Sequence, residues 1–509
     1  MATNSSKTDP SLDPSTPSPS YIAMVPKWVM IQTLLDGTAA MRQAGEDYLP
    51  RHEEESPTNY SERLSKTTLY NMTELTLDSL VGKPFVKPIK LNSDVPAAIA
   101  AITPNIDMQG TDINSFSREW MRIAIAKGFA HAYVDMPVLT EADKVNRTKE
   151  QDNAENRRPY WRLIHPEHLL FAHAEIENGV ERLTHVRILE CYTELVGFAE
   201  IEKRRIRVIT PGAFEVWEQQ EVRVKGSKKT RIEWAKTEFG AYDLPYIPLI
   251  TFYANRTGFM MAKPPLEDLA YLNIRHWQST SDQISILTVA RFPILAVAGA
   301  HDQTGDTMRI GPKQLLATID PNGRFYYVEH KGEAIKAGKE DLADLVEAMA
   351  SYGAEFLRKK VGGRTATERA LDTAETMSPL KDMTNRFASC IAQALKITAD
   401  WLKLPTGGTV KIDTDLTEVV DDPASLQALV AARKSGDISW ETFIQALIIH
   451  GVIDDDLNLE DEKARVELES KVAMKAAADL AKQAAKDKAA AQGAPPDNTQ
   501  VQDQNITAA

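Results

Sequence analysis

The sequence predicts an α+β fold, because helical and strand-like patterns occupy separate stretches of the 509-residue chain. Apolar residues recur with helical spacing before residue 128 and again after about residue 264. Between residues 160 and 253 they alternate with polar residues, which is typical of strands with one buried face. The strands are grouped in one block and are not interleaved singly with helices, so we expect an antiparallel sheet.

Length and composition set limits on the organisation. At 56.6 kDa the chain is too long for one simple core, and we expect two to four substructures. Its 43% apolar and 26% charged residues are typical of a globular protein. The only cysteines, Cys191 and Cys390, form no disulfide framework and fit a reducing compartment. We expect neither a signal peptide nor a membrane span, since no suitable apolar stretch is visible.

The N-terminal part reads as helices. Residues 1–20 form a Pro/Ser/Thr-rich tail that is expected to be disordered, and short helices are predicted over 26–45. A single helix is predicted over 58–81, capped by Ser56 or Thr58 and ended by Gly82 and Pro84. Another is predicted over 112–127, with Phe116, Trp120, Ile123 and Ala124 on its buried face and Gly128 at its end; a strand follows at 129–138.

The strand block reads as an antiparallel meander with Pro-Gly and Gly-Ser turns. We expect one face of this meander to carry four pairs of apolar residues: Ile206 with Val208, Phe214 with Val216, Val222 with Val224, and Ile232 with Trp234.

The helical period returns with two long helices. The first is predicted from about 264 to 291, between Pro265 and Pro293. A turn-rich insert follows, with strand-like pieces at 314–319 and 324–330. The second helix spans 338–360, and its buried stripe is predicted to contain Leu342, Leu345, Val346, Met349, Gly353 and Phe356.

The last part is mainly helical. A third long helix is predicted over 366–402 and should kink at Pro379. A short strand is predicted at 409–416, and helical hairpins are predicted over 423–468. Beyond about 488 the composition predicts disorder.

Charge is unevenly distributed along a chain of net charge −13. Residues 413–469 contain nine Asp and six Glu against four Lys or Arg, a balance of −11 that would repel nucleic acid. In contrast, residues 356–370 carry one acid, Glu368, and two adjacent glycines, Gly362 and Gly363, among five basic residues: Arg358, Lys359, Lys360, Arg364 and Arg369. Any DNA contact would therefore be local.

No catalytic pattern accompanies this basic segment. Its adjacent glycines, preceded by a helix and not followed by Lys-Ser or Lys-Thr, do not form a phosphate-binding P-loop. His165, His168 and His173 lack the spacing of a zinc site, and Cys390 reads as a packed residue. The acidic stretch near 454 lacks the glycine and ligand spacing of a calcium-binding loop. We predict a non-enzymatic protein with no metal and no cofactor.

The segment LLDGTAAMRQAGEDYLPRHEEESPTNYSERLSKTTLYNMTELTLDSLVGKPF, together with the order of elements, resembles tailed-bacteriophage portal proteins. More narrowly it is similar to a portal-like family first catalogued as a phage domain of unknown function. The shared pattern is G-x-x-A-M-R-x-A-G-x-x-Y-L-P, then E-x(4)-Y-x-x-R-L, then an N-x-T helix that ends in glycine. The resemblance covers roughly residues 25–470.

The resemblance implies a portal fold, with an α/β wing, an antiparallel helical stem, a small β-containing clip and a helical crown. The implied parts are a disordered tail (1–24), wing (25–263), stem helix (264–292), clip (293–335), stem helix (336–360), tunnel loop (361–366), long kinked wing helix and strand (367–412), acidic crown (413–470), and a helical then disordered tail (471–509).

The resemblance also implies a function. Portal proteins form a ring, usually of twelve copies, at one capsid vertex, and double-stranded DNA is packaged and ejected through it without sequence specificity. The implied partners are further copies of the chain, the terminase large subunit, the major capsid or scaffold protein, and a head-completion or neck adaptor protein, with no membrane. The expected location is the virion, after synthesis in the host bacterial cytoplasm.

The basic segment then has three readings. Arg358, Lys359, Lys360, Gly362, Gly363, Arg364 and Arg369 are candidates for a channel or tunnel-loop contact with DNA phosphates. They could instead pair with acidic residues of a neighbouring subunit, or simply complement the end of a helix dipole. Two rival functions remain at this point: a scaffold or head–tail adaptor without a DNA channel, and a phosphate-handling enzyme that uses residues 358–369.

Overall fold

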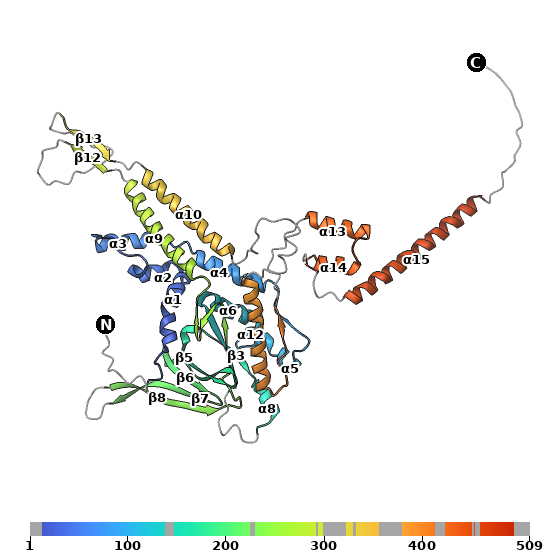
Figure 1. Cartoon of the computed structure of the whole chain (residues 1–509), viewed down its shortest axis with the longest axis horizontal. Helices are drawn as coiled ribbons and strands as arrows, with labels where there is room; N and C mark the ends of the chain where they lie inside the picture. The colour runs from blue at the N-terminus through green and yellow to red at the C-terminus, as the bar shows by residue number, and fades with distance from the viewer. Residues whose placement is uncertain are drawn as a thin grey trace, which may run out of the picture. The chain divides into compact units, whose positions relative to one another are not determined.

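The chain is α+β, as predicted, and divides into two compact units, Met1–Leu416 and Thr417–Ala509. A computed structural model (Figure 1) describes residues 13–137, 147–223, 230–291, 294–298, 322–328, 332–355, 379–412, 423–449, 452–453 and 459–492. The first unit holds the sheets and the large hydrophobic core, and the second is helical.

The N-terminal helices form a layer on the large hydrophobic core of the first unit. Helix α1 (Pro19–Leu35) begins after Ser18, whose side chain accepts a hydrogen bond from the Tyr21 amide, and α2 (Gly37–Ala44) follows directly. The buried face of α1 carries Trp28, Ile31 and Leu34.

The single helix predicted over 58–81 is wrong, because the structure has two helices there. Helix α3 (Pro57–Lys66) is capped by Ser56, and α4 (Met72–Gly82) is capped by Asn71. Thr67 adopts an extended backbone, and its carbonyl accepts two hydrogen bonds from the Arg42 guanidinium. Asn71 also donates to the Leu34 carbonyl. These contacts with α1 and α2 stabilise the break, and sequence periodicity does not register them.

Helix α6 (Ile113–Lys127) confirms the prediction for 112–127. Asp112 caps its start, Phe116, Trp120, Ile123 and Ala124 are buried, and Gly128 ends it with a φ of 95°. Strand β2 (Phe129–Asp135) follows at once and is almost entirely buried. It is the central strand of a three-stranded antiparallel sheet with β3 (Tyr160–Ile164) and β9 (Leu249–Tyr253).

The predicted antiparallel meander is confirmed as part of a five-stranded sheet in the order β4-β5-β6-β7-β8. Its strands are β4 (Leu169–Glu177), β5 (Val180–Val196), β6 (Ala199–Thr210), β7 (Ala213–Arg223) and β8 (Thr230–Ala241).

The predicted common face of this meander is wrong for its first two pairs. Ile206 pairs with Trp217, whereas Val216 pairs with Arg207. The two-residue turn after Thr210 sets this register, and a shift of one residue moves a side chain to the other face. Ile206 and Val208 therefore lie on the face opposite Phe214 and Val216.

A buried charged cluster joins the two sheets. Glu190 on β5 lies 2.8 Å from Arg162 on β3, 2.6 Å from Arg205 and 2.7 Å from Arg207 on β6. Burial raises the pKa of Glu190, but Arg162 and Arg207 outweigh this effect and lower it to about 2. The carboxylate therefore stays ionised and holds the two sheets at a fixed spacing.

Helix α12 (Pro379–Trp401) closes the core of the first unit. Phe387 packs at ring-centroid distances of 5.2 Å from Trp120 and 4.7 Å from Phe252, and Trp161 donates to Thr398 at 2.9 Å. The residues before Pro379 lie outside the described ranges, and so does the predicted kink.

Several short elements complete the first unit. They are α5 (Ala97–Ala100), α8 (Lys149–Ala154), the β1 (Lys90–Leu91) and β14 (Val410–Lys411) pair, the β10 (Arg256–Gly258) and β11 (Met261–Ala262) pair, and 3-10 turns at Gly45–Asp47, Lys83–Phe85, Thr103–Asn105 and Pro166–His168.

The second unit consists of three described helices. Helices α13 (Pro423–Ser435) and α14 (Trp440–Ile449) pack as a hairpin within the region predicted over 423–468. Helix α15 (Leu459–Gln492) runs from that region into the tail that was expected to begin as a helix. None of the helices that the structure describes carries an apolar stretch sufficient to cross a membrane.

Candidate functional site: the α9–α10 helix pair and its base

Two long helices of the first unit run beside each other (Figure 1). Helix α9 (Glu267–Ala290) follows two prolines, and α10 (Glu333–Glu355) starts after Gly332. Between them, β12 (Ile294–Ala298) pairs antiparallel with β13 (Arg324–Val328). β13 falls within the strand-like piece predicted at 324–330. β12 was missed, because its residues extend the apolar run of the preceding helix.

The contacts between the helices run in opposite directions along the two chains. Gln283 donates to the Ile335 carbonyl at 3.0 Å, Ser279 donates to Asp341 at 2.7 Å, and the Tyr352 hydroxyl donates to the Pro265 carbonyl at 3.0 Å. The pair is therefore antiparallel, so the end of α10 lies beside the start of α9. The predicted stripe of α10 is confirmed at Leu345 and Met349, which are buried.

The base of α9 is held by buried polar contacts to the N-terminal layer. Asn273 is fully buried, and its oxygen accepts hydrogen bonds from the amide and the hydroxyl of Thr73, both at 3.0 Å. Its amide nitrogen donates to the Tyr70 carbonyl at 2.9 Å. Trp277, one turn further, is also fully buried. These contacts fix both the rotation and the height of α9 on α4.

A buried ion pair holds the next turn of α9. Arg63 on α3 lies 2.7 Å from Glu55, and both side chains are less than 10% exposed. Arg63 also donates to the Ser281 hydroxyl at 3.2 Å. Hydrogen bonds from Arg63 lower the pKa of Glu55 to about 2, against the opposing effect of burial.

Sequence reasoning missed these anchoring residues. Asn273, Trp277 and Ser281 recur every four residues, so they share one face of α9. Polar residues on a stripe that also contains a tryptophan are the signal that could have identified a hydrogen-bonded helix face.

The solvent face of α10 is acidic. Glu340, Asp344 and Glu347 lie at i, i+4 and i+7 and are exposed, and Lys336 lies 3.7 Å from Glu340. Asp341 at the edge of this face pairs with Arg275 at 3.1 Å. This face would repel nucleic-acid phosphates rather than bind them.

A cavity of about 310 Å³ lies where α9 begins, α10 ends and α12 begins. Its charged walls are already paired: Lys263 with Asp268 at 2.7 Å, and Asp382 with Arg386 at 3.0 Å. Arg386 also donates to the carbonyls of Tyr253 and Ala254. No group among these residues is arranged as a nucleophile with a base.

The predicted DNA-contact residues are not described. Arg358, Lys359, Lys360, Gly362, Gly363, Arg364 and Arg369 all lie within 356–378, outside the described ranges. The described chain leaves at Glu355 and resumes at Pro379, and Tyr352 and Pro379 both line the cavity at the helix base.

The histidines do not converge on a metal site. The rings of His165 and His168 lie 5.6 Å apart, and burial lowers the pKa of both. The ammonium group of Lys127 further lowers the pKa of His165, while His173 lies 3.6 Å from Glu175. Within the part of the chain that the structure describes, no three His, Cys, Asp or Glu side chains are grouped to hold a metal ion. Burial raises the pKa of Cys390 to about 12, which fits a packed thiol.

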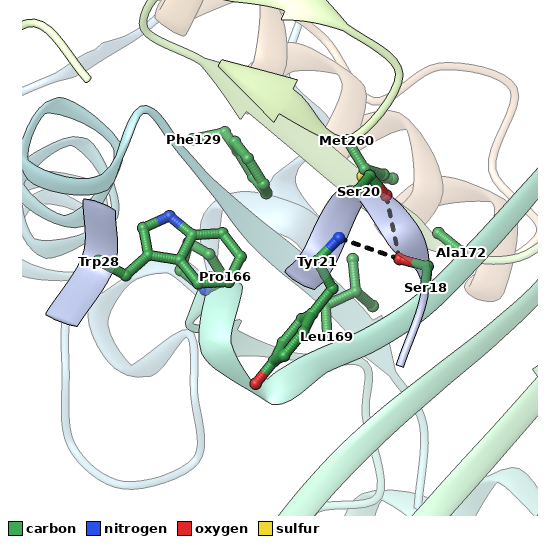
Figure 2. Close-up of a pocket in the computed structure, with 9 residues that line it drawn as sticks. All are labelled: Ser18, Ser20, Tyr21, Trp28, Phe129, Pro166, Leu169, Ala172 and Met260. Carbon is green, nitrogen blue, oxygen red and sulfur yellow. Dashed lines mark hydrogen bonds between the residues drawn. The ribbon is translucent and has the colours of Figure 1, made fainter. Parts of the chain in front are cut away.

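A second, very small cavity of about 10 Å³ lies between α1 and β4 (Figure 2). Ser18 and Ser20 are hydrogen-bonded to each other at its edge, and the Tyr21 hydroxyl donates outside it to the Glu167 carbonyl. Its size is close to that of one water molecule, and Trp28, Phe129 and Leu169 line the rest. It is a small gap in the packing of α1 against the neighbouring residues.

Comparison with protein families finds one match. The model of a domain of unknown function (DUF4055) matches residues 265–402, which contain α9, the β12–β13 hairpin, α10 and α12. The N-terminal segment on which the resemblance to portal proteins depends lies outside this match. No curated protein matches the chain.

Among solved structures, the chain is similar to chains of gene transfer agent particles. A chain of the virion of a native particle has a TM-score of 0.39 and 10% identity, with 81% of this chain and 98% of that chain covered. A chain of the neck of an empty particle, computed with C6 symmetry, has a TM-score of 0.39 and 9% identity, with 82% and 99% covered. A chain of the neck of a native particle, computed with C12 symmetry, has a TM-score of 0.38 and 9% identity, with 75% and 89% covered. Similarity at this level does not establish a shared function.

Proposed function

We propose that this chain is a phage portal protein. Identical copies form a ring at one capsid vertex, and double-stranded DNA is packaged and ejected through the central channel. The observation that carries the proposal is the antiparallel α9–α10 pair, rooted in the α/β unit and interrupted by the β12–β13 hairpin. This arrangement matches the stem and clip that the resemblance implies.

The geometry suits a wall element of a tube. At 1.5 Å per residue, the 24-residue α9 is about 36 Å long. Copies joined head to tail close into a ring when the rotation between neighbours divides a full turn. Asn273 and the Glu55–Arg63 pair hold the helix pair to the N-terminal layer, so that each wall element keeps one orientation during the passage of DNA.

Passage of DNA requires weak contacts. Glu340, Asp344 and Glu347 dominate the solvent face of α10, and its Lys336 lies 3.7 Å from Glu340. The five basic residues of 358–369 are few and close to glycines. Phosphate contacts carry no sequence information, and many weak contacts repeated by symmetry allow the duplex to slide. We place these residues near DNA, with pairing to a neighbouring subunit as the alternative.

The other proposed partners follow from the two ends of the stem. The clip would face the terminase large subunit during packaging and the neck adaptor afterwards, and the wing would face the capsid or scaffold protein. No catalytic role is proposed, since the channel acts through shape and charge. The protein would be found in the virion.

Native mass measurement combined with electron microscopy of the purified full-length protein tests the proposal. We expect closed rings, with twelve copies as the leading expectation, and a stem that protrudes on one side. A head–tail adaptor or scaffold would give a ring without a stem or no ring, and either result would exclude the proposal. ATP hydrolysis by the purified protein would favour the enzyme that uses residues 358–369.

A further inference from the structure

Helix α15 carries a seam of small and apolar residues, and its large members are exposed in the part of the unit that the structure describes. Val466, Ala473 and Leu480 recur every seven residues, and Ser470, Ala477 and Ala484 fall at the intermediate positions. This 4-3 spacing is that of a two-stranded coiled coil. Val466 is 42% exposed and Leu480 is 71% exposed, so the seam lies open to solvent. Small residues at alternate layers would let a second helix approach closely.

The charges beside the seam are divided between the two halves of the helix. The positions that flank the seam in the first half carry Glu460, Glu462, Glu467 and Glu469. The corresponding positions in the second half carry Met474, Ala476, Ala481, Gln483, Lys488 and Ala490, of which only Lys488 is charged. Counting every side chain, residues 459–470 have five acids against two bases, a net of −3, and residues 471–492 have five bases against two acids, a net of +3.

The helix dipole does not account for this division. Acidic residues favour a helix start and basic residues favour a helix end, but the effect is limited to the first and last turns. Glu467, Glu469, Lys471 and Lys475 lie two or more turns inside α15. Lys471 lies 4.0 Å from Glu467 within α15, so local pairing accounts for part of the division. The glutamates beside the seam bear on the orientation of a partner helix.

We propose that α15 pairs with α15 of a second copy of this chain, in antiparallel orientation. A parallel pair would place the four flanking glutamates of one helix against the same four of the other, which is unfavourable. An antiparallel pair places them against the flank of the second half, which carries Met474, Ala476, Ala481 and Gln483. With the helices fully overlapped, Val466 lies opposite Ala484 and Ser470 lies opposite Leu480, so each large residue meets a small one.

Disulfide cross-linking of the full-length protein tests this orientation. One sample carries Val466→Cys, the other carries Ala484→Cys, and both carry Cys191→Ser to remove the exposed thiol. After mixing and mild oxidation we expect on the order of tenfold more 466–484 dimer than either variant forms alone. The matched control is Leu468→Cys mixed with Ala484→Cys, because Leu468 lies on the other side of the helix and should not react.

A dimer formed by Val466→Cys alone would mean parallel pairing and would overturn the proposal, as would the absence of cross-links in every mixture. Charge reversal provides an independent test on the same cross-link, with all charge changes placed in both the Val466→Cys and the Ala484→Cys chains. Ala481→Glu with Gln483→Glu should lower the yield, because these side chains then face Glu467 and Glu469 of the partner helix, and Glu467→Lys with Glu469→Lys added to the same chains should restore it. Failure of that rescue, with helix content unchanged by circular dichroism, contradicts the pairing.

This inference does not depend on the proposed function. The cross-link is read on a denaturing gel, which reports pairs whether or not a ring forms. Cross-linking without rings would remove only the portal proposal, and rings without cross-linking would remove only the pairing.

Discussion

Asn273 and Thr73 form a double hydrogen bond in which one buried amide oxygen accepts from both the backbone amide and the hydroxyl, each at 3.0 Å. The same amide group donates to the Tyr70 carbonyl at 2.9 Å. One side chain thus satisfies three polar groups at the contact between α4 and α9.

We therefore expect Asn273→Ala to lower the free energy of unfolding by about 2–4 kcal/mol, because buried polar groups would be left without partners. The measurement is urea unfolding followed by circular dichroism. Arg275→Ala is the matched control on the same helix, since this exposed ion pair with Asp341 should contribute less than about 1 kcal/mol. Equal effects of the two changes would contradict the role given to Asn273.

The Glu55–Arg63 pair should show strong non-additivity. Arg63→Leu leaves the Glu55 carboxylate buried without its partner, which costs about 3–5 kcal/mol of unfolding free energy. Replacing both residues with leucine should recover most of that loss. A double-mutant cycle in urea measures the coupling, and simple addition of the two single effects would show that the pair does not interact.

Acid unfolding should depend on Glu190. Its pKa is about 2 in the folded protein and near 4.3 in an unfolded chain, so ionisation stabilises the fold above about pH 4.3. That contribution, about 3 kcal/mol at most, is lost as the pH falls from about 4 to 2. We expect Glu190→Gln to destabilise the protein at neutral pH and to flatten this part of the stability profile.

The control for this prediction is Glu194→Gln, an exposed glutamate on the same strand. It should leave the profile unchanged. Burial raises the pKa of the neighbouring Asp135, which acts in the opposite direction, and comparison of the two glutamine variants isolates the effect of Glu190. A Glu190→Gln profile parallel to that of the native protein would refute the assignment.

Gly128 should be the most sensitive helix-ending glycine. Its φ is 95°, and an added Cβ would come within 2.8 Å of the Ala262 Cβ. Gly128→Ala therefore combines backbone strain with overpacking, and we expect a loss of about 3 kcal/mol in unfolding free energy. Gly179→Ala, with a φ of 79° but open space, should cost only about 1 kcal/mol. Thermal or urea unfolding of both variants decides this, and an equal loss would mean that the Ala262 contact is unimportant.

Contact between the basic segment and DNA phosphates would make duplex DNA binding depend on the salt concentration. If Lys359 and Lys360 contact phosphates, Lys359→Ala with Lys360→Ala should reduce the salt dependence of binding to random-sequence duplex DNA, and weaken binding equally for all sequences. The measurement is fluorescence anisotropy at several salt concentrations. An unchanged salt slope, with rings still formed, would favour pairing with a neighbouring subunit.

Sequence periodicity predicted those elements whose residues interact mainly along the chain. Helix α6 was found because Asp112, Gly128 and its apolar face are all local signals. Helices α9 and α10 were found for the same reason, with proline and glycine near their ends.

The failures came from contacts between distant residues. The break between α3 and α4 depends on Arg42, which is 25 positions from Thr67, and β12 is recognisable only through its pairing with β13. The common face predicted for β6 and β7 was wrong because the length of the turn between these strands decides which of their residues share a face. Of the candidate site, the α9–α10 pair could be predicted from the sequence. The contacts of Asn273 and Arg63 that anchor α9 could not, because a polar residue in a helix does not reveal which partner it will contact.

Because α10 returns to the start of α9, the far end of the helix pair can be exchanged as a unit. Because Tyr352 and Pro265 lie at hydrogen-bonding distance, residues beyond them can be lengthened, shortened or exchanged without changing where the chain enters and leaves the α/β unit. If the proposed function holds, variation at the tip would alter which partner docks while the body keeps its architecture. A peptide tag inserted there would then disturb docking with little effect on folding.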